Sequence, residues 1–327
     1  MQLSAEQRAA DLALLQLGRR LRADGYRFTC VTPATQAHNN ARPEAQQAHS
    51  LRDVFGWNRP FAEQLLCADQ LKQMEVAAIL NREGPWLRSN VRWSSLDDML
   101  LLHSGFPTQE TDAVFFGPDS YRFAQVIHDH LQHRYQPVQH AVDIGCGNGI
   151  GALLIAQAAR HAQVTAVDIN PKALRYTAIN AALAGVANLS IEHSDILDGI
   201  SGNFDLIVAN PPYMLDARER TYRHGGGALG AALSLRILEQ AIQRLSAGGT
   251  LLLYTGVAIV DGRDCLLEAC RTTLQGQQWQ WHYRELDPDV FGEQLLEPGY
   301  DQVERIAAVA LSVTCNPGTD SADERTM

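Results

Sequence analysis

The heptapeptide Asp143-Ile144-Gly145-Cys146-Gly147-Asn148-Gly149 stands where an apolar strand pattern ends and a helical pattern begins. Its glycines allow a tight turn and let a ligand approach the backbone closely. A strand, a glycine-rich turn and a helix in this order are typical of a parallel α/β sheet, which binds ligands at the carboxyl ends of its strands. We therefore expect a ligand-binding crevice at the edge of such a sheet, with this turn in its wall.

Around this turn, strand and helix patterns alternate, which predicts a Rossmann-like α/β fold with helices on both faces of a mostly parallel sheet. Seven strands are expected, together with three clear helices. The strands are Ala141–Ile144, Gln163–Asp168, Leu189–Glu192, Leu206–Ala209, Thr250–Tyr254, Trp279–Glu285 and Ile306–Val313. The helices are Gly149–His161, Pro171–Ala184 and Ala232–Leu245, the last stopped by Gly248-Gly249.

The first third of the chain has a different, mostly helical pattern. A capping box at Ser4 begins the first helix and Gly25 ends it, and further helical patterns cover residues 59–68 and 70–81. Two apolar runs, Val91–Leu96 and Met99–His103, predict a β-hairpin. We expect an N-terminal domain over residues 1–110 that selects the substrate, an α/β domain over residues 111–315 and a disordered polar tail over residues 316–327.

Composition and charge narrow the class of protein. Of the 327 residues, 46% are hydrophobic and 20% are charged, as in ordinary soluble domains, and no apolar run is long enough to span a membrane. Six scattered cysteines without a CxxC pair indicate a reducing, cytoplasmic compartment. Residues 1–134 are near charge balance, so most of the net charge of −10 lies in the α/β half. This half should repel polyanions such as nucleic acid.

A carboxylate at the end of the second strand, Asp168, suits the two hydroxyls of a ribose because it is an acceptor only. The same pattern fits a dinucleotide, since Gly147–Ala152 matches the relaxed G-x-G-x-x-A fingerprint. Asp143 and Asp195 favour S-adenosylmethionine instead. Asp143 would face a pyrophosphate badly but suits a positive amino group, and Asp195 could accept from an adenine amino group.

Both acids retain a structural alternative, a helix cap for Asp143 and a turn carboxylate for Asp195. The predicted cofactor contacts are Asp143, Gly145, Cys146, Gly147, Asn148, Gly149, Asp168, Ile169, Asp195, Ile196 and Asn210.

The second informative element is Asn210-Pro211-Pro212-Tyr213, which follows the apolar run Leu206–Ala209. The lone pair of an amide or aromatic amine is delocalised, so methyl transfer to such a nitrogen needs acceptors that orient its N–H groups. The side chain of Asn210 and the carbonyl of Pro211 can supply them, and the prolines add no competing N–H donor. Tyr213 offers a ring face to a flat group. We predict Asn210, Pro211, Pro212 and Tyr213 as the catalytic residues.

These elements together resemble class I S-adenosylmethionine-dependent methyltransferases. The most similar branch is the small-domain branch, which includes HemK-like release-factor glutamine methyltransferases and enzymes that methylate exocyclic amines of nucleobases. The resemblance covers about residues 112–255. It implies a seven-stranded sheet with an antiparallel last hairpin, acceptor-holding roles for Asn210 and Tyr213, and S-adenosylmethionine as donor, with S-adenosylhomocysteine as product.

Three departures from the pattern of the glutamine methyltransferases leave the identity of the methyl acceptor open. The Pro-Arg segment of the glutamine enzymes is replaced by residues 114–121, no Glu-Pro follows Tyr213, and Tyr254-Thr255-Gly256 stands in place of Glu-x-Gly. A protein glutamine is the first choice, a nucleobase amine in RNA or DNA the second, and a small metabolite amine or amide the third. A dehydrogenase and a non-enzymatic binding module are the remaining alternatives, and the oligomeric state is open.

Two further groups are candidates for substrate contacts. The loop from Arg218 to Gly227 contains arginines and a glycine triplet, so it could form a mobile lid whose Arg220 and Arg223 bind a carboxylate or phosphate. Phe115, Phe116 and Tyr121 could line the pocket mouth. A solvated loop and core packing are the respective alternatives. The histidines of residues 128–133 lack further ligands at metal spacing, so no metal site is predicted.

Overall fold

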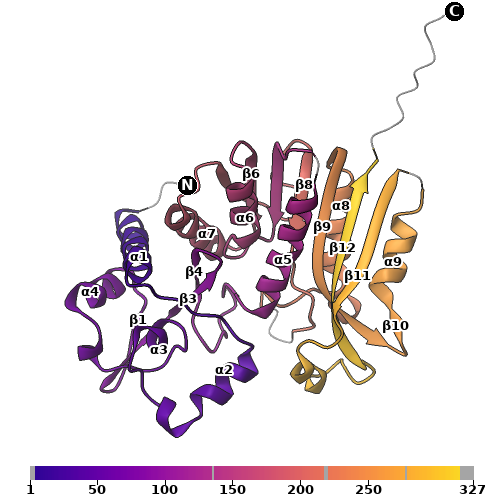
Figure 1. Ribbon diagram of the computed structural model, residues 1–327. Coiled ribbons are helices and arrows are strands. Elements are labelled where there is room, and N and C mark those ends of the chain that lie inside the picture. The colour runs from indigo at the N-terminus through magenta and orange to yellow at the C-terminus, as the bar shows by residue number, and fades with distance from the viewer. Residues whose placement is uncertain (1–3, 135, 217–219, 277, 317–327) are drawn as a thin grey trace, which may run out of the picture.

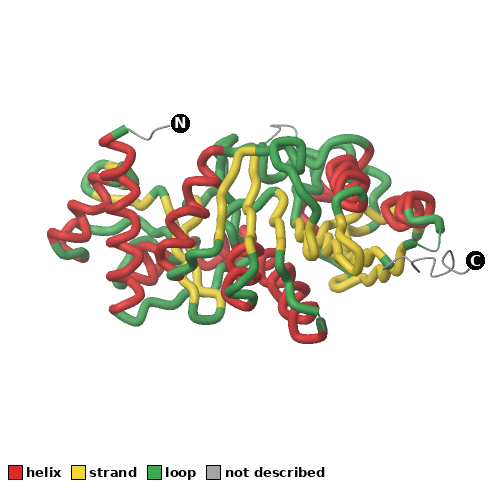
Figure 2. Tube along the Cα trace, turned by 90° about the horizontal axis from the view of Figure 1, so that it is seen from above, coloured by secondary structure: helices red, strands yellow, loops and turns green. Residues whose placement is uncertain are grey.

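The computed structural model describes residues 4–134, 136–216, 220–276 and 278–316, so the predicted disorder of the tail falls outside the described residues except for Asn316. The elements run from the mostly helical N-terminal region at one end of the molecule to strands β11 and β12 at the other (Figure 1). Viewed from above, helices lie on both sides of the central strands (Figure 2). The predicted α/β class is confirmed.

The central sheet has the strand order β11-β12-β9-β8-β5-β6-β7, with the short β10 paired to β9. Strands β5 to β9 are mutually parallel where they pair, whereas β12 is antiparallel to both β9 and β11. This is the predicted seven-strand arrangement with an antiparallel last hairpin. The strands are β5 (His140–Ile144), β6 (Gln163–Asp168), β7 (Leu189–His193), β8 (Phe204–Ala209), β9 (Leu245–Val260), β10 (Arg263–Asp264), β11 (Trp279–Asp287) and β12 (Arg305–Cys315).

Alternation along the strands divides the core between the two faces of the sheet. In β8, Leu206 and Val208 face a cluster that contains residues of α5, α6 and α7, whereas Ile207 and Ala209 face residues of α8 and α9. Because both faces are covered, Leu206–Ala209 of β8 form an unbroken apolar run. The helices are α5 (Pro118–His133), α6 (Ile150–Ala158), α7 (Pro171–Ala184), α8 (Ala232–Ile242) and α9 (Cys265–Thr273).

The boundary between α8 and β9 differs from the prediction. Helix α8 ends at Ile242, and β9 begins at Leu245 rather than at Thr250. Gly248 and Gly249 therefore lie in a strand irregularity, where the pairing with β8 shifts register. Gly248 has a φ of 73°, and a Cβ on Gly249 would lie 2.6 Å from the carbonyl oxygen of Phe204. The glycines serve this bulge and do not stop the helix.

The N-terminal region contains α1 (Ala5–Ala23), α2 (Pro33–Asn40), α3 (Leu51–Phe55), α4 (Ala68–Val76), and the hairpins β1 (Leu80–Glu83)–β2 (Trp86–Ser89) and β3 (Val91–Leu96)–β4 (Met99–Ser104). The predicted cap at Ser4 and the second hairpin are present. The helix predicted over residues 59–68 is wrong. Pro60 favours extended backbone before it, and Phe61 bridges Leu87 of β2, so only a short 3₁₀ turn forms at Glu63–Leu65. The helix predicted over residues 70–81 ends early, at Val76.

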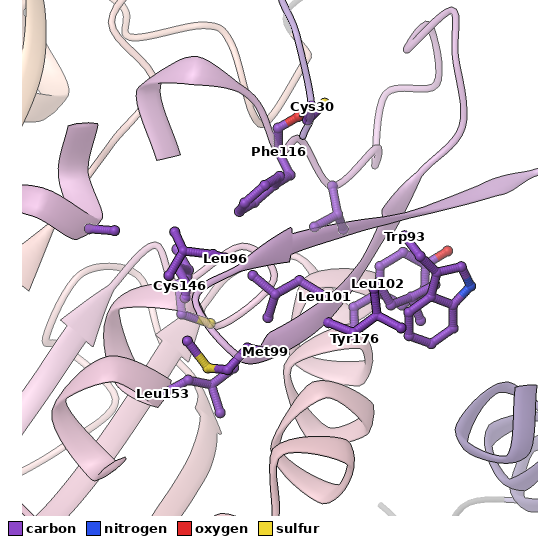
Figure 3. Packing of buried hydrophobic residues seen from close by; sticks show 14 of the residues in the cluster. Cys30, Trp93, Leu96, Met99, Leu101, Leu102, Phe116, Cys146, Leu153 and Tyr176 are labelled. Carbon is purple, nitrogen blue, oxygen red and sulfur yellow. Dashed lines mark hydrogen bonds between the residues drawn. The ribbon is translucent and has the colours of Figure 1, made fainter. Parts of the chain in front are cut away.

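The N-terminal hairpin packs against the elements that carry the glycine turn. Figure 3 shows Met99 and Leu101 of β4 beside Cys146 of the turn and Leu153 of α6. Helix α1 crosses the same region at Gly18, where a Cβ would lie 2.7 Å from the ring of Trp93. One apolar core therefore runs from the N-terminal helices to this face of the sheet.

Candidate active site

A cavity of about 190 Å³ opens at the carboxyl ends of β5, β6 and β8. Its lining includes Gly145–Asn148 of the glycine turn and all four residues of Asn210–Tyr213. The two motifs are far apart in the chain, but their strands are direct neighbours, with Ile144 of β5 paired to Ala209 of β8. Strand order thus brings both motifs to one crevice, as their positions predicted.

The glycine turn presents bare backbone to this cavity. Gly145 and Gly147 have φ values of 65° and 56°, and a Cβ on either residue would meet nothing within 4 Å. A ligand can therefore approach both glycines. Gly149 has a different role, because a Cβ there would lie 2.7 Å from the side chain of Thr177 on α7. This glycine serves helix packing and does not line the cavity, which corrects its expected role as a cofactor contact.

The carboxylate of Asp143 is buried and bonded to helix α6. Its Oδ2 accepts from the backbone N–H of Ala152 at 2.8 Å, and burial raises the pKa of Asp143 to about 7. A Cβ on Gly151 would lie 2.8 Å from this carboxylate, so the helix approaches it closely only because a glycine stands there. Asp143 also lines the cavity. Its hydrogen bond anchors helix α6 to β5, although the cap position of this helix is Gly149 rather than Asp143.

Asp168 and Asp195 occupy the ends of neighbouring strands. The Asp168 carboxylate accepts from the backbone N–H of Gly147 at 2.9 Å and of Asn170 at 2.8 Å, which holds it beside the glycine turn. Burial raises the pKa of Asp168, the hydrogen bonds opposing this effect. Asp195 is half exposed and pairs with Arg236 at 3.1 Å. Both carboxylates line the cavity.

Two isoleucines follow these acids. Ile169 is 50% exposed and Ile196 is buried with a φ of 50°, and both line the cavity. An exposed branched apolar side chain next to two carboxylates suits a ligand with a flat apolar part and polar edges.

Acidic groups outnumber basic groups around the cavity. Four carboxyl groups line it, from Asp119, Asp143, Asp168 and Asp195, and Arg223 is the single basic side chain among the described lining residues. Such a lining attracts a cation and repels a pyrophosphate. It therefore disfavours the dinucleotide alternative left open by the glycine pattern.

The turn Asn210–Tyr213 is called the acceptor turn below. Within it, Asn210 and Pro211 keep free hydrogen-bonding capacity. Among the described residues, neither the Asn210 side chain nor the Pro211 carbonyl oxygen makes a hydrogen bond. Both residues line the cavity. Buried or half-buried polar groups in proteins are normally paired, so two free acceptors facing one cavity indicate a site for a ligand with N–H donors.

Tyr213 is held more tightly than the stacking prediction implies. Only 8% of the residue is exposed, its hydroxyl donates to Asp119, and a Cβ on Gly256 would overlap its ring. Its ring also packs against Phe291, with centroids 6.3 Å apart. One face of the ring is thus packed against β9. These contacts support an anchored ring rather than an open stacking surface.

The arginines of the predicted lid have separate roles. Arg220 donates twice to the Asp216 carboxylate, at 2.9 and 2.5 Å, and once to the carbonyl oxygen of Thr108 at 3.3 Å. It does not line the cavity, so its predicted substrate role is corrected. Arg223 does line the cavity and donates to Gln294. Arg218 lies outside the described residues.

The first glycine of the triplet is packed against the turn Asn210–Tyr213. Gly225 is buried, and a Cβ there would lie 2.7 Å from the carbonyl oxygen of Pro212 and 2.8 Å from the Cα of Tyr213. Close approach to the acceptor turn explains this glycine.

Phe116 and Tyr121 are not pocket residues, which corrects their predicted substrate roles. Phe116 is fully buried near Cys30 (Figure 3). The Tyr121 hydroxyl accepts from Cys30 N–H at 3.0 Å and donates to Ser95 at 3.1 Å, on the side of the N-terminal domain. Phe115 does line the cavity and stacks on Tyr222 with ring centroids 6.0 Å apart.

Several lining residues were missed, namely Asp119, Tyr222 and Phe291. Of these three residues, only Asp119 carried a local sequence signal, because it follows Pro118 at the start of a helix.

Within the described ranges, no group of three or more potential ligands could hold a metal ion. Nor does any described helix combine the length and apolar character needed to cross a membrane.

Comparison with known proteins agrees with this geometry. Residues 123–258 match the family described as methyltransferase small domain. The chain carries a methyltransferase small domain. Its resemblance to the small-domain branch of methyltransferases is thereby confirmed.

Two relatives of this chain are named as glutamine methyltransferases. It is similar to the release factor glutamine methyltransferase of Deinococcus radiodurans, 32% identical over 197 residues, which cover 57% of this chain and 66% of that protein. It is also similar to the ribosomal protein uL3 glutamine methyltransferase of Bordetella pertussis, 37% identical over 131 residues, 36% of this chain and 44% of that protein. The chain thus spans only part of the length of these curated relatives.

A solved structure with a similar fold is the SAM-dependent methyltransferase from Agrobacterium tumefaciens. It has a TM-score of 0.47 and 19% identity, covering 77% of this chain and 80% of that one.

Proposed function

We propose that this protein is an S-adenosylmethionine-dependent N-methyltransferase that methylates the side-chain amide of a glutamine in a protein. The observation that carries the proposal is the pair of free acceptors, on Asn210 and Pro211, beside a crevice lined by carboxylates and bare glycines. One half of the cavity suits a cationic nucleoside, and the other half suits a planar N–H donor.

The donor half fits S-adenosylmethionine. Asp168 can bind the ribose hydroxyls, Ile169 and Ile196 can contact the adenine, and Asp195 can accept from its amino group. The open backbone at Gly145 and Gly147 leaves room for the methionine part, and the negative lining favours its positive groups. When bound, this cofactor supplies an electrophilic methyl group.

The acceptor half orients the nitrogen that receives the methyl group. A primary amide has two N–H groups, and the Asn210 side chain and the Pro211 carbonyl can each accept one. With both N–H groups held, the nitrogen lone pair points out of the amide plane toward the donor half. With S-adenosylmethionine bound, transfer of its methyl group would form a carbon–nitrogen bond, break a carbon–sulfur bond and leave S-adenosylhomocysteine, and the nitrogen would lose its proton to solvent. No strong general base is required.

A glutamine of a protein is favoured over the other acceptors by two observations. The relatives from Deinococcus radiodurans and Bordetella pertussis are named glutamine methyltransferases of protein substrates. Phe115, Tyr222 and Phe291 line the cavity, Phe291 beside Tyr213, and most of the net negative charge lies in this half of the chain. An apolar rim and a repulsive field disfavour a polyanionic nucleic acid. Six free cysteines support a cytoplasmic setting.

The experiment is transfer of a radiolabelled methyl group from S-adenosylmethionine to a cell extract. We expect the label to enter protease-sensitive, nuclease-resistant material, and acid hydrolysis to release it as methylamine, as a methylated amide requires. The Asn210→Ala protein should label nothing above background. Label in nuclease-sensitive material would establish a nucleobase acceptor instead, and label resistant to both enzymes would establish a small-molecule acceptor.

A further inference from the structure

The side chain of Asp119 is a buried carboxylate in the wall of the acceptor half. It lies in the first turn of α5, is 4% exposed and lines the cavity beside Phe123. A buried carboxylate needs hydrogen-bond donors to remain charged, and a helix N-terminus favours its charge. The mechanism above leaves this group unused.

Three side chains from different parts of the fold donate to Asp119. Its Oδ2 accepts from the hydroxyl of Tyr213, which is 94 positions away in the chain. Its Oδ1 accepts from the hydroxyl of Tyr254 on β9 at 2.8 Å and from Arg122 at 3.2 Å. Arg122 is itself held by Asp287 of β11 at 2.6 Å. Both carboxylate oxygens are therefore occupied, and Asp119 can reach the acceptor only through a partner.

The partner that matters is Tyr213, because it ends the acceptor turn. A Cβ on Gly256 would overlap its ring, and a Cβ on Gly230 would overlap its backbone carbonyl. These contacts restrict where the ring can go, and the hydroxyl bond fixes the position of its distal end. The free hydrogen-bond acceptors belong to Asn210 and Pro211, which precede this anchored residue in the same turn.

We propose that Asp119 is a positioning residue that fixes the acceptor turn through the hydroxyl of Tyr213. This inference rests on the proposed function for its kinetic consequences, and it has a structural consequence that does not depend on activity. Without the Asp119–Tyr213 bond, the hydroxyl end of the side chain is no longer tethered to α5, and the turn carrying the two acceptors loses this anchor.

A matched control exists in the same protein. The hydroxyl of Tyr283 on β11 donates to Asp264 at 2.7 Å. This second tyrosine–aspartate pair is half-buried and lies outside the cavity lining. Tyr283→Phe therefore removes the same atom and the same type of bond as Tyr213→Phe, away from the acceptor turn.

The first test is hydrogen–deuterium exchange of the full-length protein, followed by mass spectrometry. Peptides that cover residues 206–216 should exchange at least several-fold faster in Asp119→Asn and in Tyr213→Phe than in the wild type. In Tyr283→Phe these peptides should exchange as in the wild type. Unchanged exchange in the first two variants would overturn the proposal, whether or not the protein transfers methyl groups.

The second test is kinetic. Asp119→Asn and Tyr213→Phe should each lower kcat by about 10-fold to 10²-fold, since small misplacements of reacting groups cost this much. Because both remove one bond, the double variant should lose no more than the single variants. Binding of S-adenosylmethionine, followed by calorimetry, should change less than about twofold. Additive losses, or a loss confined to donor binding, would reject the positioning role. A wild type that labels no acceptor would reject the proposed function alone.

Discussion

The side chain of Asn180 on α7 hydrogen-bonds both backbone groups of Leu102 on β4, accepting at 2.8 Å and donating at 3.2 Å. The same amide donates to the carbonyl oxygen of Asn148 at 2.9 Å. One fully buried side chain therefore joins the N-terminal hairpin to the glycine turn. The N-terminal region thus supports the cofactor half of the site as well as packing beside it.

Replacing Asn180 by leucine should destabilise the protein and weaken donor binding together. The substitution keeps the number and branching of the side-chain heavy atoms but leaves the buried N–H of Leu102 unpaired, which should lower the free energy of unfolding by at least about 2 kcal/mol. Urea denaturation and calorimetric titration with S-adenosylmethionine measure the two effects. Asn39→Ala removes a side-chain bond to Thr35 near the surface and serves as the control. Equal stability of the two variants would contradict this role.

Gly147→Ala should block donor binding through its side chain. The new Cβ would enter open cavity space, and a φ of 56° is also strained for alanine. Gly185→Ala is the matched control, because Gly185 has a φ of 72° and equally open surroundings at the end of α7. Both variants should lose about 1–2 kcal/mol of stability. Only Gly147→Ala should lose affinity for S-adenosylmethionine; equal affinities would exclude close approach of the donor.

Asn210→Ala should separate donor binding from transfer. Its side-chain amide has no hydrogen bond within the described structure, so its removal should cost little stability. Transfer should fall about 10²-fold or more, as when one positioned polar group is removed from an active site. Calorimetry should show nearly normal binding of S-adenosylmethionine. Retained transfer would remove Asn210 from the mechanism.

Stability should depend on pH through Asp143. Burial raises the pKa of this carboxyl from 3.8 to about 7 in the folded protein. The folded state therefore keeps a proton that the unfolded state releases near pH 4. The contribution of this group to stability is complete below about pH 4 and is lost as the pH rises through about 7.

Urea denaturation of the wild type and Asp143→Asn at pH 5 and pH 8 tests this sign. The stability of the wild type relative to the variant should be greater at pH 5 than at pH 8. A difference that does not change with pH would show that Asp143 does not titrate in this range.

Alanine substitutions of Arg220 and Arg223 should have different effects, the first on the local structure and the second on substrate binding. Arg220→Ala leaves the buried Asp216 carboxylate without its cation, so exchange of the segment that follows Met214 should accelerate. Arg223→Ala should instead raise KM for the methyl acceptor several-fold, because Arg223 lines the cavity. Steady-state kinetics and hydrogen exchange distinguish the two. A raised KM in Arg220→Ala without faster hydrogen exchange would show that Arg220 contacts the substrate.

Much of the fold and the position of the crevice could be predicted from local patterns. The glycine turn needs a backbone that only glycine adopts readily, and Asp168 and Asn210 each stand next to a strand end that periodicity reveals. Parallel strands then bring these ends to one edge. The cap of the first helix and the β3–β4 hairpin could also be predicted, because each depends on a short stretch of sequence. The helix predicted over residues 59–68 failed because Pro60 and the bridge from Phe61 to Leu87 override its apolar spacing.

The sequence by itself determined which chemistry stands at the strand ends, because turn conformation and the position of each strand end depend on short-range pattern. Only the tertiary structure decided what each charged side chain contacts. Asp119 meets Tyr213 across 94 positions, Asp143 bonds the backbone of α6, and Arg220 faces Asp216 rather than the cavity. The pairing of a buried charge depends on which elements pack around it, and no local pattern records that neighbourhood.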